Sequence, residues 1–207
     1  MSIGQKPLFR DVWALGPPST GYPGAFPRGL INRIRERWWG KDRLWLFSGG
    51  FKDPEGTTVD IKKEVQPDHV CNCEQLPFED ETFDFVMLDP PYSQKEARDL
   101  YGLPYHNILK VMDEAARVCR TGGHVILLHR LIPWYHPWES IHKKRLKPVA
   151  VVGVYTIAGY SNLRALTVWR KQAESARPAR KRSKASASQP HKAAKGGPLL
   201  KNGRQRS

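Results

Sequence analysis

Residues 83–92 read Phe-Asp-Phe-Val-Met-Leu-Asp-Pro-Pro-Tyr, and this stretch decides how the rest of the chain is interpreted. The run Phe83–Leu88 has the length and apolar character of a strand buried in a parallel sheet, and Asp89 follows it directly. Pro90 and Pro91 fix the backbone and remove two N–H donors, so the turn displays carbonyl oxygens. In open α/β sheets, ligands bind beyond the carboxyl ends of the strands. The stretch therefore predicts a functional site at the end of this strand.

The segments around this motif alternate between short apolar runs and stretches with helical periodicity. Such alternation is typical of an α/β domain with a mostly parallel sheet flanked by helices. The last two apolar runs are joined by the turn Ala158–Ser161 and predict a hairpin with an antiparallel strand that closes the sheet. Strands are expected at 43–47, 57–61, 69–72, 83–88, 124–128, 149–157 and 163–170, and helices at about 27–39 and 107–119.

The motif places two hydrogen-bond acceptors side by side, the Asp89 carboxylate and the Pro90 carbonyl. The amino nitrogen of an aromatic base is a poor nucleophile because its lone pair is delocalised into the ring. Two acceptors aimed at its hydrogens favour a pyramidal, more nucleophilic geometry, and Tyr92 offers a face on which the base can stack. A plain proline turn is the alternative, and the position directly after a buried run argues against it. The motif therefore predicts chemistry on an exocyclic amine.

On these residues the chain resembles the class I S-adenosylmethionine-dependent amino-methyltransferases, notably the DNA adenine-N6 and cytosine-N4 methyltransferases. The resemblance runs from about Tyr22 to Lys171, and Phe47-Ser-Gly-Gly50 is similar to the glycine loop of that family. It implies a Rossmann-like class I methyltransferase sheet, S-adenosylmethionine as the cofactor, and Asp89–Tyr92 as the catalytic motif.

The same resemblance assigns the cofactor site mainly to residues at or near the carboxyl ends of the expected strands. Asp60 matches the acid that accepts from the ribose hydroxyls, and Asn72 stands where the family usually has an Asp that contacts the adenine amino group. The segment that begins at Tyr22 resembles the one that lines the methionine end of the cofactor. The full set of implied cofactor residues is Tyr22, Pro23, Phe26, Phe47, Ser48, Gly49, Gly50, Asp60, Ile61, Asn72, Cys73 and Asp89.

The chain departs from the family pattern in two places. Only nine residues separate Gly50 from Asp60, too few for the helix that normally follows the glycine loop, so a short loop such as Phe51–Gly56 is expected instead. Asn72 lacks the charge of the usual Asp, although its carbonyl oxygen can still accept a hydrogen bond. We therefore expect both strands to be kept around a more open cofactor pocket.

Composition separates a folded part from a charged tail. The chain has 207 residues, 40% of them hydrophobic, which suits one domain with a real core and excludes wholesale disorder. The net charge is +14, and residues 171–207 contribute eleven Lys or Arg against one acid while holding almost no large apolar side chain. We expect a methyltransferase domain at 1–171 and a basic, disordered tail at 172–207.

Membrane, secretory and metal classes are not expected. No stretch approaches the ~18 consecutive apolar residues of a membrane span. The first residues lack the apolar core of a signal peptide. Cys71, Cys73 and Cys119 are too few and too unevenly spaced for a disulfide framework or a four-ligand zinc site. These features favour a reducing, cytoplasmic setting.

Two segments are candidates for nucleic-acid contact. The basic tail would attract a polyanion, and the region Trp134–Lys147 combines aromatic side chains with a basic cluster, as sequence-tolerant nucleic-acid surfaces do. A tail that only aids solubility, and tryptophans packed under the sheet edge, are the alternatives. The chain has no room for a target-recognition domain, so sequence discrimination is expected to be weak or to come from a separate specificity subunit or a second copy.

The predicted function is methyl transfer to the exocyclic amino group of a nucleic-acid base, with adenine N6 in DNA as the favoured target. One rival is an RNA base or protein-amide methyltransferase, since related Pro-Pro-Tyr/Phe motifs, usually opening with Asn, serve those reactions. The other is a catalytically silent Rossmann-like domain that binds nucleic acid through its tail. The intact Asp89 argues against silence, because a silent domain does not need that acid.

Overall fold

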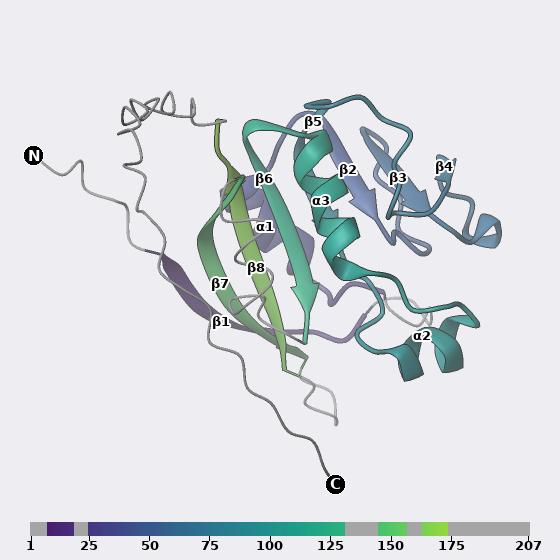
Figure 1. Cartoon of the computed structure of the whole chain (residues 1–207). Coiled ribbons are helices and arrows are strands. Elements are labelled where there is room, and N and C mark those ends of the chain that lie inside the picture. The colour runs from purple at the N-terminus through teal and green to yellow at the C-terminus, as the bar shows by residue number, and fades with distance from the viewer. Residues whose placement is uncertain (1–7, 19–24, 131–144, 157–162, 174–207) are drawn as a thin grey trace, which may run out of the picture. The chain divides into compact units, whose positions relative to one another are not determined.

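The structure is a computed structural model that describes residues 8–18, 25–130, 145–156 and 163–173. The described strands form one sheet in the order β1-β7-β8-β6-β5-β2-β3-β4 (Figure 1). β8 is antiparallel to both of its neighbours and every other pairing is parallel. The strands are β1 Phe9–Leu15, β2 Arg43–Leu46, β3 Gly56–Asp60, β4 His69–Val70, β5 Phe83–Leu88, β6 Cys119–His129, β7 Leu146–Thr156 and β8 Arg164–Lys171. The helices are α1 Leu30–Trp38, the 3-10 turn η1 Lys63–Val65, α2 Gln94–Tyr101 and α3 Ile108–Val118.

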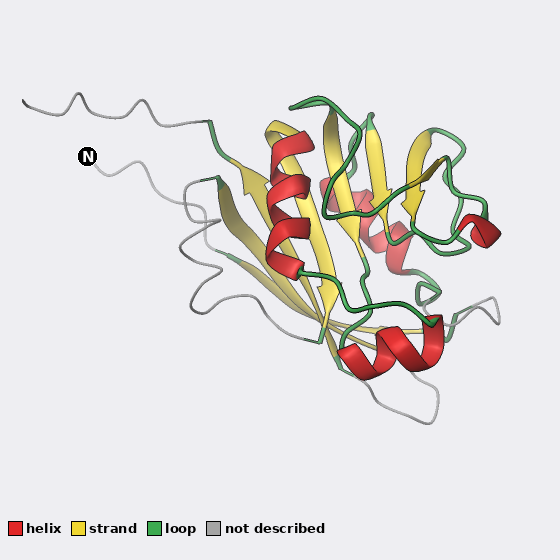
Figure 2. Ribbon diagram, turned by 45° about the vertical axis from the view of Figure 1, so that its right-hand side comes forward, coloured by secondary structure: helices red, strands yellow, loops and turns green. Residues whose placement is uncertain are grey.

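Helices cover both faces of the sheet (Figure 2). Successive side chains of a strand point to opposite faces, so Leu44 and Leu46 of β2 join the core under α3, while Trp45 joins the core under α1. Both helices bury apolar side chains at helical spacing. The longest described helix, α3, has eleven residues, and none of the described helices is long and apolar enough to cross a membrane.

The predicted Rossmann-like α/β sheet is confirmed, including its antiparallel strand pair. The expectation that the hairpin closes the sheet is wrong. β8 is inserted between β6 and β7, and the additional strand β1 lies outside β7 in parallel. The sequence gives little sign of β1 because only Trp13 and Leu15 are buried, while Arg10, Asp11 and Val12 are exposed on this edge strand. The turn Ala158–Ser161 lies outside the described residues.

The connection between β2 and β3 is a short loop, as the nine-residue spacing predicts. A buried ion pair closes it: Asp53 accepts from Arg43 Nε at 2.7 Å and from Arg43 Nη2 at 2.9 Å. The Trp45 indole N–H donates to the same carboxylate at 2.8 Å, and the Phe51 ring packs on Trp45 with 4.5 Å between the ring centroids. Side-chain contacts to β2 thus hold the loop where a helix would otherwise pack.

Candidate active site

The site lies at the edge of the sheet where the parallel strands end. β2 runs directly into a sharp turn in which Phe47 has φ 56° and Gly49 has φ 50°. A left-handed conformation is costly for a bulky residue such as Phe, so its presence marks a turn that the surrounding contacts impose. The Ser48 amide donates to the Val59 carbonyl at 3.1 Å, which ties this turn to β3. The glycine loop is therefore fixed beside the end of the neighbouring strand.

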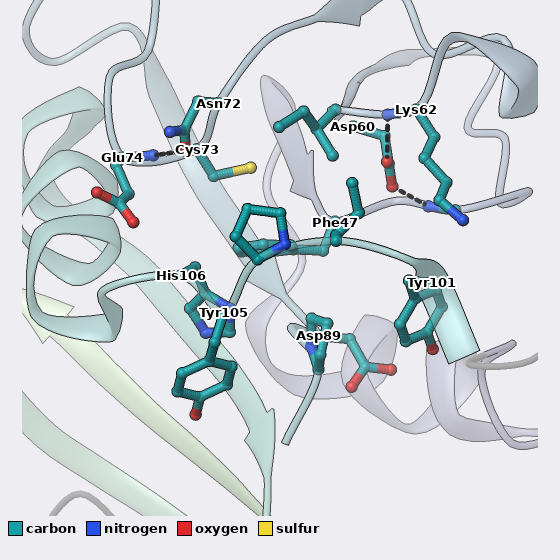
Figure 3. A pocket seen from close by; sticks show the side chains of 15 residues that line it. Phe47, Asp60, Lys62, Asn72, Cys73, Glu74, Asp89, Tyr101, Tyr105 and His106 are labelled. Carbon is teal, nitrogen blue, oxygen red and sulfur yellow. Dashed lines mark hydrogen bonds between the residues drawn. The ribbon is translucent and has the colours of Figure 1, made fainter. Parts of the chain in front are cut away.

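Asp60, the last residue of β3, holds the same turn from the other side. One carboxylate oxygen accepts from the Gly49 amide at 2.9 Å, and the other accepts from the Lys62 amide at 2.9 Å (Figure 3). A carboxylate has about four lone-pair positions, so two remain for a ligand. Asn72 follows β4, and its side-chain oxygen accepts from the Glu74 amide at 2.9 Å. Both side chains line a pocket at the carboxyl edge.

This cofactor pocket gathers most of the residues that the sequence assigned to the cofactor. Its walls contain Phe47, Gly49, Asp60, Ile61, Asn72, Cys73 and Asp89, all predicted, together with Pro91 of the catalytic motif. Its other lining residues are Lys62, Glu74, Tyr101, Leu103, Pro104, Tyr105 and His106.

Other predicted cofactor residues lie elsewhere. Ser48 and Gly50 belong to the glycine turn but do not line the pocket. Phe26 packs against Trp45 and Phe51 in the aromatic cluster of the α1 face. The remaining two, Tyr22 and Pro23, lie outside the described residues, as do 131–144 and 174–207, which contain most of the expected nucleic-acid contacts.

The pocket wall formed by 101–106 is the part that the sequence reading missed. Figure 3 shows Tyr101, Tyr105 and His106 on the side of the pocket opposite Asp60 and Asn72. α2 ends at Tyr101, and Gly102 caps it in a left-handed conformation, which turns the chain into this wall. The signals were the aromatic run Tyr101–His106 and the capping pattern Ser-Gln-Lys-Glu at 93–96.

The capping pattern also fixes the loop after the catalytic motif. The Ser93 hydroxyl accepts from the Glu96 amide at 3.1 Å, as an N-cap does. The Glu96 carboxylate reaches back and accepts from the Tyr92 amide at 2.7 Å. The first turn of α2 thus holds Tyr92 and Ser93, the two residues that follow Pro91, through hydrogen bonds with Glu96.

Asp89 lies at the centre of the site, and only one of its two carboxylate oxygens accepts a hydrogen bond from the described residues. Oδ1 accepts from the Tyr92 hydroxyl at 2.7 Å. Oδ2 is buried and has no hydrogen-bond partner among the described residues. Burial raises the pKa of Asp89 from its ordinary 3.8 to about 7, while the Tyr92 hydrogen bond and Arg164 lower it and Glu96 raises it further. A buried acceptor without a partner is costly, so Oδ2 is available for a ligand donor.

A second pocket meets the first at Asp89. Besides Asp89, its charged side chains are Glu96 from α2, Arg130 from the residue after β6, and Arg164 from β8. We call it the substrate pocket. Asp89, Pro91 and Tyr101 line both pockets, and the substrate pocket also contains Pro18, Ala25, Pro90, Tyr92, Leu100 and Thr156.

Tyr92 is held by contacts on its hydroxyl and on its ring. The hydroxyl lies 3.2 Å from Arg164 Nη1, the Arg130 guanidinium lies 5.3 Å from the ring centroid, and the His129 ring packs edge-on at 5.2 Å. Burial lowers the pKa of His129 to about 4, and burial together with His129 lowers that of His106 to about 4. Both imidazoles are therefore neutral at physiological pH.

The comparisons with known proteins agree with this arrangement. Residues 53–127 match a family described as a methyltransferase domain, and the match runs from the β2–β3 loop into β6, across Asp60, Asn72 and Asp89. Over these residues the chain is similar to a methyltransferase domain, and its sheet has the class I methyltransferase fold. The predicted fold class is confirmed, and S-adenosylmethionine is the cofactor of this class. No curated protein matches the chain.

Solved structures match the methyltransferase domain in fold. One is the N-methyltransferase NodS from Bradyrhizobium japonicum in complex with S-adenosyl-L-homocysteine, with 14% identity, a TM-score of 0.50, and coverage of 69% of this chain and 83% of that one. Another is the protein BH2331 from Bacillus halodurans, with 14% identity, a TM-score of 0.50, and coverage of 70% and 100%. A third is the complex between the methyltransferase activator Trm112 from Haloferax volcanii and a candidate methyltransferase, with 12% identity, a TM-score of 0.50, and coverage of 69% and 89%.

Proposed function

We propose that this methyltransferase acts on the exocyclic amino group of a nucleic-acid base, with adenine N6 in DNA as the favoured target. The observation that carries the proposal is Asp89, which lines both pockets and whose Oδ2 is a buried acceptor without a hydrogen-bond partner among the described residues. An amine placed there would meet an acceptor on one side and the methyl donor on the other.

The lining of the cofactor pocket suits S-adenosylmethionine. Asp60 keeps lone pairs for the two ribose hydroxyls, and the apolar Phe47 and Ile61 side chains offer surface to a flat base. Asn72 stands at the same wall with its oxygen engaged by Glu74, which leaves its amide N–H groups to meet ring nitrogen acceptors. When bound, the cofactor supplies an electrophilic methyl group on a positively charged sulfur.

The catalytic work of the chain falls to Asp89 and Pro90. Asp89 Oδ2 and the Pro90 carbonyl accept the two hydrogens of the target amine, which directs the nitrogen lone pair out of conjugation with the ring. The nitrogen must lose one proton when it gains a methyl group. Because the pKa of Asp89 is about 7, its carboxylate can take that proton near neutral pH.

The substrate pocket supports a nucleic-acid ligand rather than a small amine. Arg130 and Arg164 contribute two guanidinium groups beside the carboxyl groups of Asp89 and Glu96, and Arg130 pairs with Glu96 at 3.7 Å. Guanidinium groups bind phosphate and stack on planar rings, so this lining suits a base flipped out of a polyanion. The expected contacts of the basic tail and of Trp134–Lys147 would add to it.

The proposal is tested with labelled S-adenosylmethionine and separate pools of DNA, RNA and protein, followed by digestion and identification of the labelled product. Label on N6-methyladenine from DNA is expected. Label in RNA or on a protein amide would favour the rival enzyme class, and cofactor binding without transfer to any pool would favour a silent domain.

A further inference from the structure

The direction of β8 places an arginine at the proposed catalytic centre. β8 is antiparallel to β6 and β7, so it begins at the edge of the sheet where the parallel strands end. Its first residue is Arg164, which pairs with Val154 of β7 and lines the substrate pocket. The motifs behind the proposed function lie on other strands, and nothing in them points to this residue.

A chain of two hydrogen bonds joins Arg164 to the catalytic acid. Arg164 Nη1 lies 3.2 Å from the Tyr92 hydroxyl oxygen, and that hydroxyl donates to Asp89 Oδ1 at 2.7 Å. A guanidinium has donors only. Arg164 must therefore donate at the Tyr92 oxygen, and the single phenol proton is left for Asp89.

We propose that Arg164 is a positioning residue that acts on Asp89 through Tyr92. By donating to the Tyr92 oxygen, Arg164 fixes the direction of the hydroxyl proton, so that Oδ1 of Asp89 is held and Oδ2 is presented to the target. This inference rests on the proposed function only in taking an amine as that target. The orientation of Asp89 is a property of the free protein.

The charges around Asp89 give Arg164 a second effect. Glu96 of α2 faces Asp89 and disfavours its ionised form, whereas Arg164 of β8 favours it. From the end of β6, Arg130 lies over the Tyr92 ring and the neutral His129 packs against its edge. Across the cofactor pocket stand Asp60, whose oxygens hold backbone amides, and Lys62, whose ammonium lies over the Tyr101 ring at 5.5 Å. Loss of Arg164 therefore raises the pKa of Asp89.

The first experiment compares the pH dependence of kcat in Arg164→Met and in the wild type. Transfer should need ionised Asp89, so the acidic limb of the variant should move to higher pH. We expect kcat to fall about tenfold at pH 6 and to recover to within about threefold of wild type at pH 9, because one unit of pKa is a tenfold change in the ionised fraction. An unshifted limb would overturn the proposal.

Arg170 provides the matched control. It lies near the other end of β8, is exposed, and donates through Nε to the Gly122 carbonyl at 3.2 Å. Arg170→Met removes an arginine from the same strand without touching the site and should leave the limb in place. Arg164→Lys keeps the cation and should restore most of the wild-type profile, and it also serves if Arg164→Met does not fold.

A double variant tests whether the effect passes through Tyr92. Tyr92→Phe removes the hydroxyl that joins Arg164 to Asp89. The positioning effect is measured as kcat at pH 9, where Asp89 is ionised in every variant. There, the variant with both Arg164→Met and Tyr92→Phe should be no slower than Tyr92→Phe alone, while its acidic limb still moves because the charge of Arg164 acts on Asp89 directly. If the two substitutions lower kcat at pH 9 independently, Arg164 does not act through Tyr92 and the proposal fails.

A measurement without substrate separates this inference from the proposed function. Asp89 binds its proton more tightly in the folded state than in the unfolded state, since its pKa is raised from 3.8 to about 7. The free energy of unfolding should therefore fall as pH rises from about 4 to about 7, and Asp89→Asn should remove this part of the dependence. In Arg164→Met the fall should extend to higher pH. This test does not depend on whether any base is methylated. If the free energy of unfolding fell over the same pH range in Arg164→Met as in the wild type, the inference would be contradicted.

Discussion

The cofactor pocket and the substrate pocket share Asp89, Pro91 and Tyr101 but differ in construction. The cofactor pocket is built mainly from turns that directly follow the parallel strands, and its carboxylate at Asp60 is bound by backbone amides. The substrate pocket draws side chains from segments far apart in the sequence and concentrates charge at Arg130 and Arg164. Cofactor binding and methyl transfer should therefore respond to different substitutions.

Asp89→Ala should give the largest effect, and it should lower the rate of methyl transfer without weakening cofactor binding. The substitution removes the acceptor for the target amine, and positioned groups of this kind contribute ~10²–10³ in rate. Binding of S-adenosylmethionine, measured by calorimetry, should change little because Asp60 and the glycine turn remain. A variant that still methylates nucleic acid at near the wild-type rate would show that Asp89 does not act on the amine.

Asp60→Ala should produce the converse result, weaker cofactor binding. Hydrogen bonds from hydroxyls to a carboxylate contribute about 1.5–3 kcal/mol, or roughly 10- to 150-fold in affinity. The loss also frees the Gly49 and Lys62 amides that Asp60 holds. Calorimetric titration of the protein with S-adenosylmethionine, without the nucleic-acid substrate, measures the change in affinity.

Asp68→Ala is the control for that measurement. Asp68 also contacts β3, accepting from the amide and hydroxyl of Thr58 at 2.8 and 2.7 Å, but it does not line the cofactor pocket. Its removal should leave the affinity unchanged. Equal losses of cofactor affinity in the two variants would mean that the loss comes from general destabilisation of β3, and that Asp60 makes no specific contact with the ribose.

Removal of the tail should have the smallest effect on the site. Residues 172–207 contain none of the motif residues, so truncation after Lys171 should preserve the fold, the cofactor affinity and the product base. Binding to duplex DNA should weaken mainly at low salt, and the plot of log affinity against log salt should flatten by about 0.9 per lost phosphate contact. An identical slope with and without the tail would make it a passive appendage and would leave Trp134–Lys147 as the candidate surface.

The same contrast explains how far the sequence could be interpreted. Phe47 and Asp89 follow strands with apolar runs, Asp60 ends β3 and Asn72 lies just after β4, so their convergence at one edge could be predicted from the order of the strands. The missing helix after the glycine loop followed from the count of residues alone, whereas the buried Arg43–Asp53 pair that holds the loop did not.

The substrate pocket shows what local patterns do not contain. Arg164 becomes a site residue only because β8 runs antiparallel and lies next to β6, which depends on the order of the whole sheet. β1 was missed because an edge strand with two buried side chains lacks a continuous apolar run. α2 was missed although Ser93 and Glu96 form a capping pattern, because the helix has eight residues and buries only Ala97.

The most direct test of the central claim uses one duplex in two forms. The full chain is incubated with labelled S-adenosylmethionine and either an adenine-containing duplex or the same duplex with purine in place of adenine, which lacks only the 6-amino group. If Asp89 Oδ2 and the Pro90 carbonyl present that amine for transfer, label should appear as N6-methyladenine in the first duplex and be absent from the second. Equal labelling of the two duplexes, or none in either while the cofactor binds, would contradict the account.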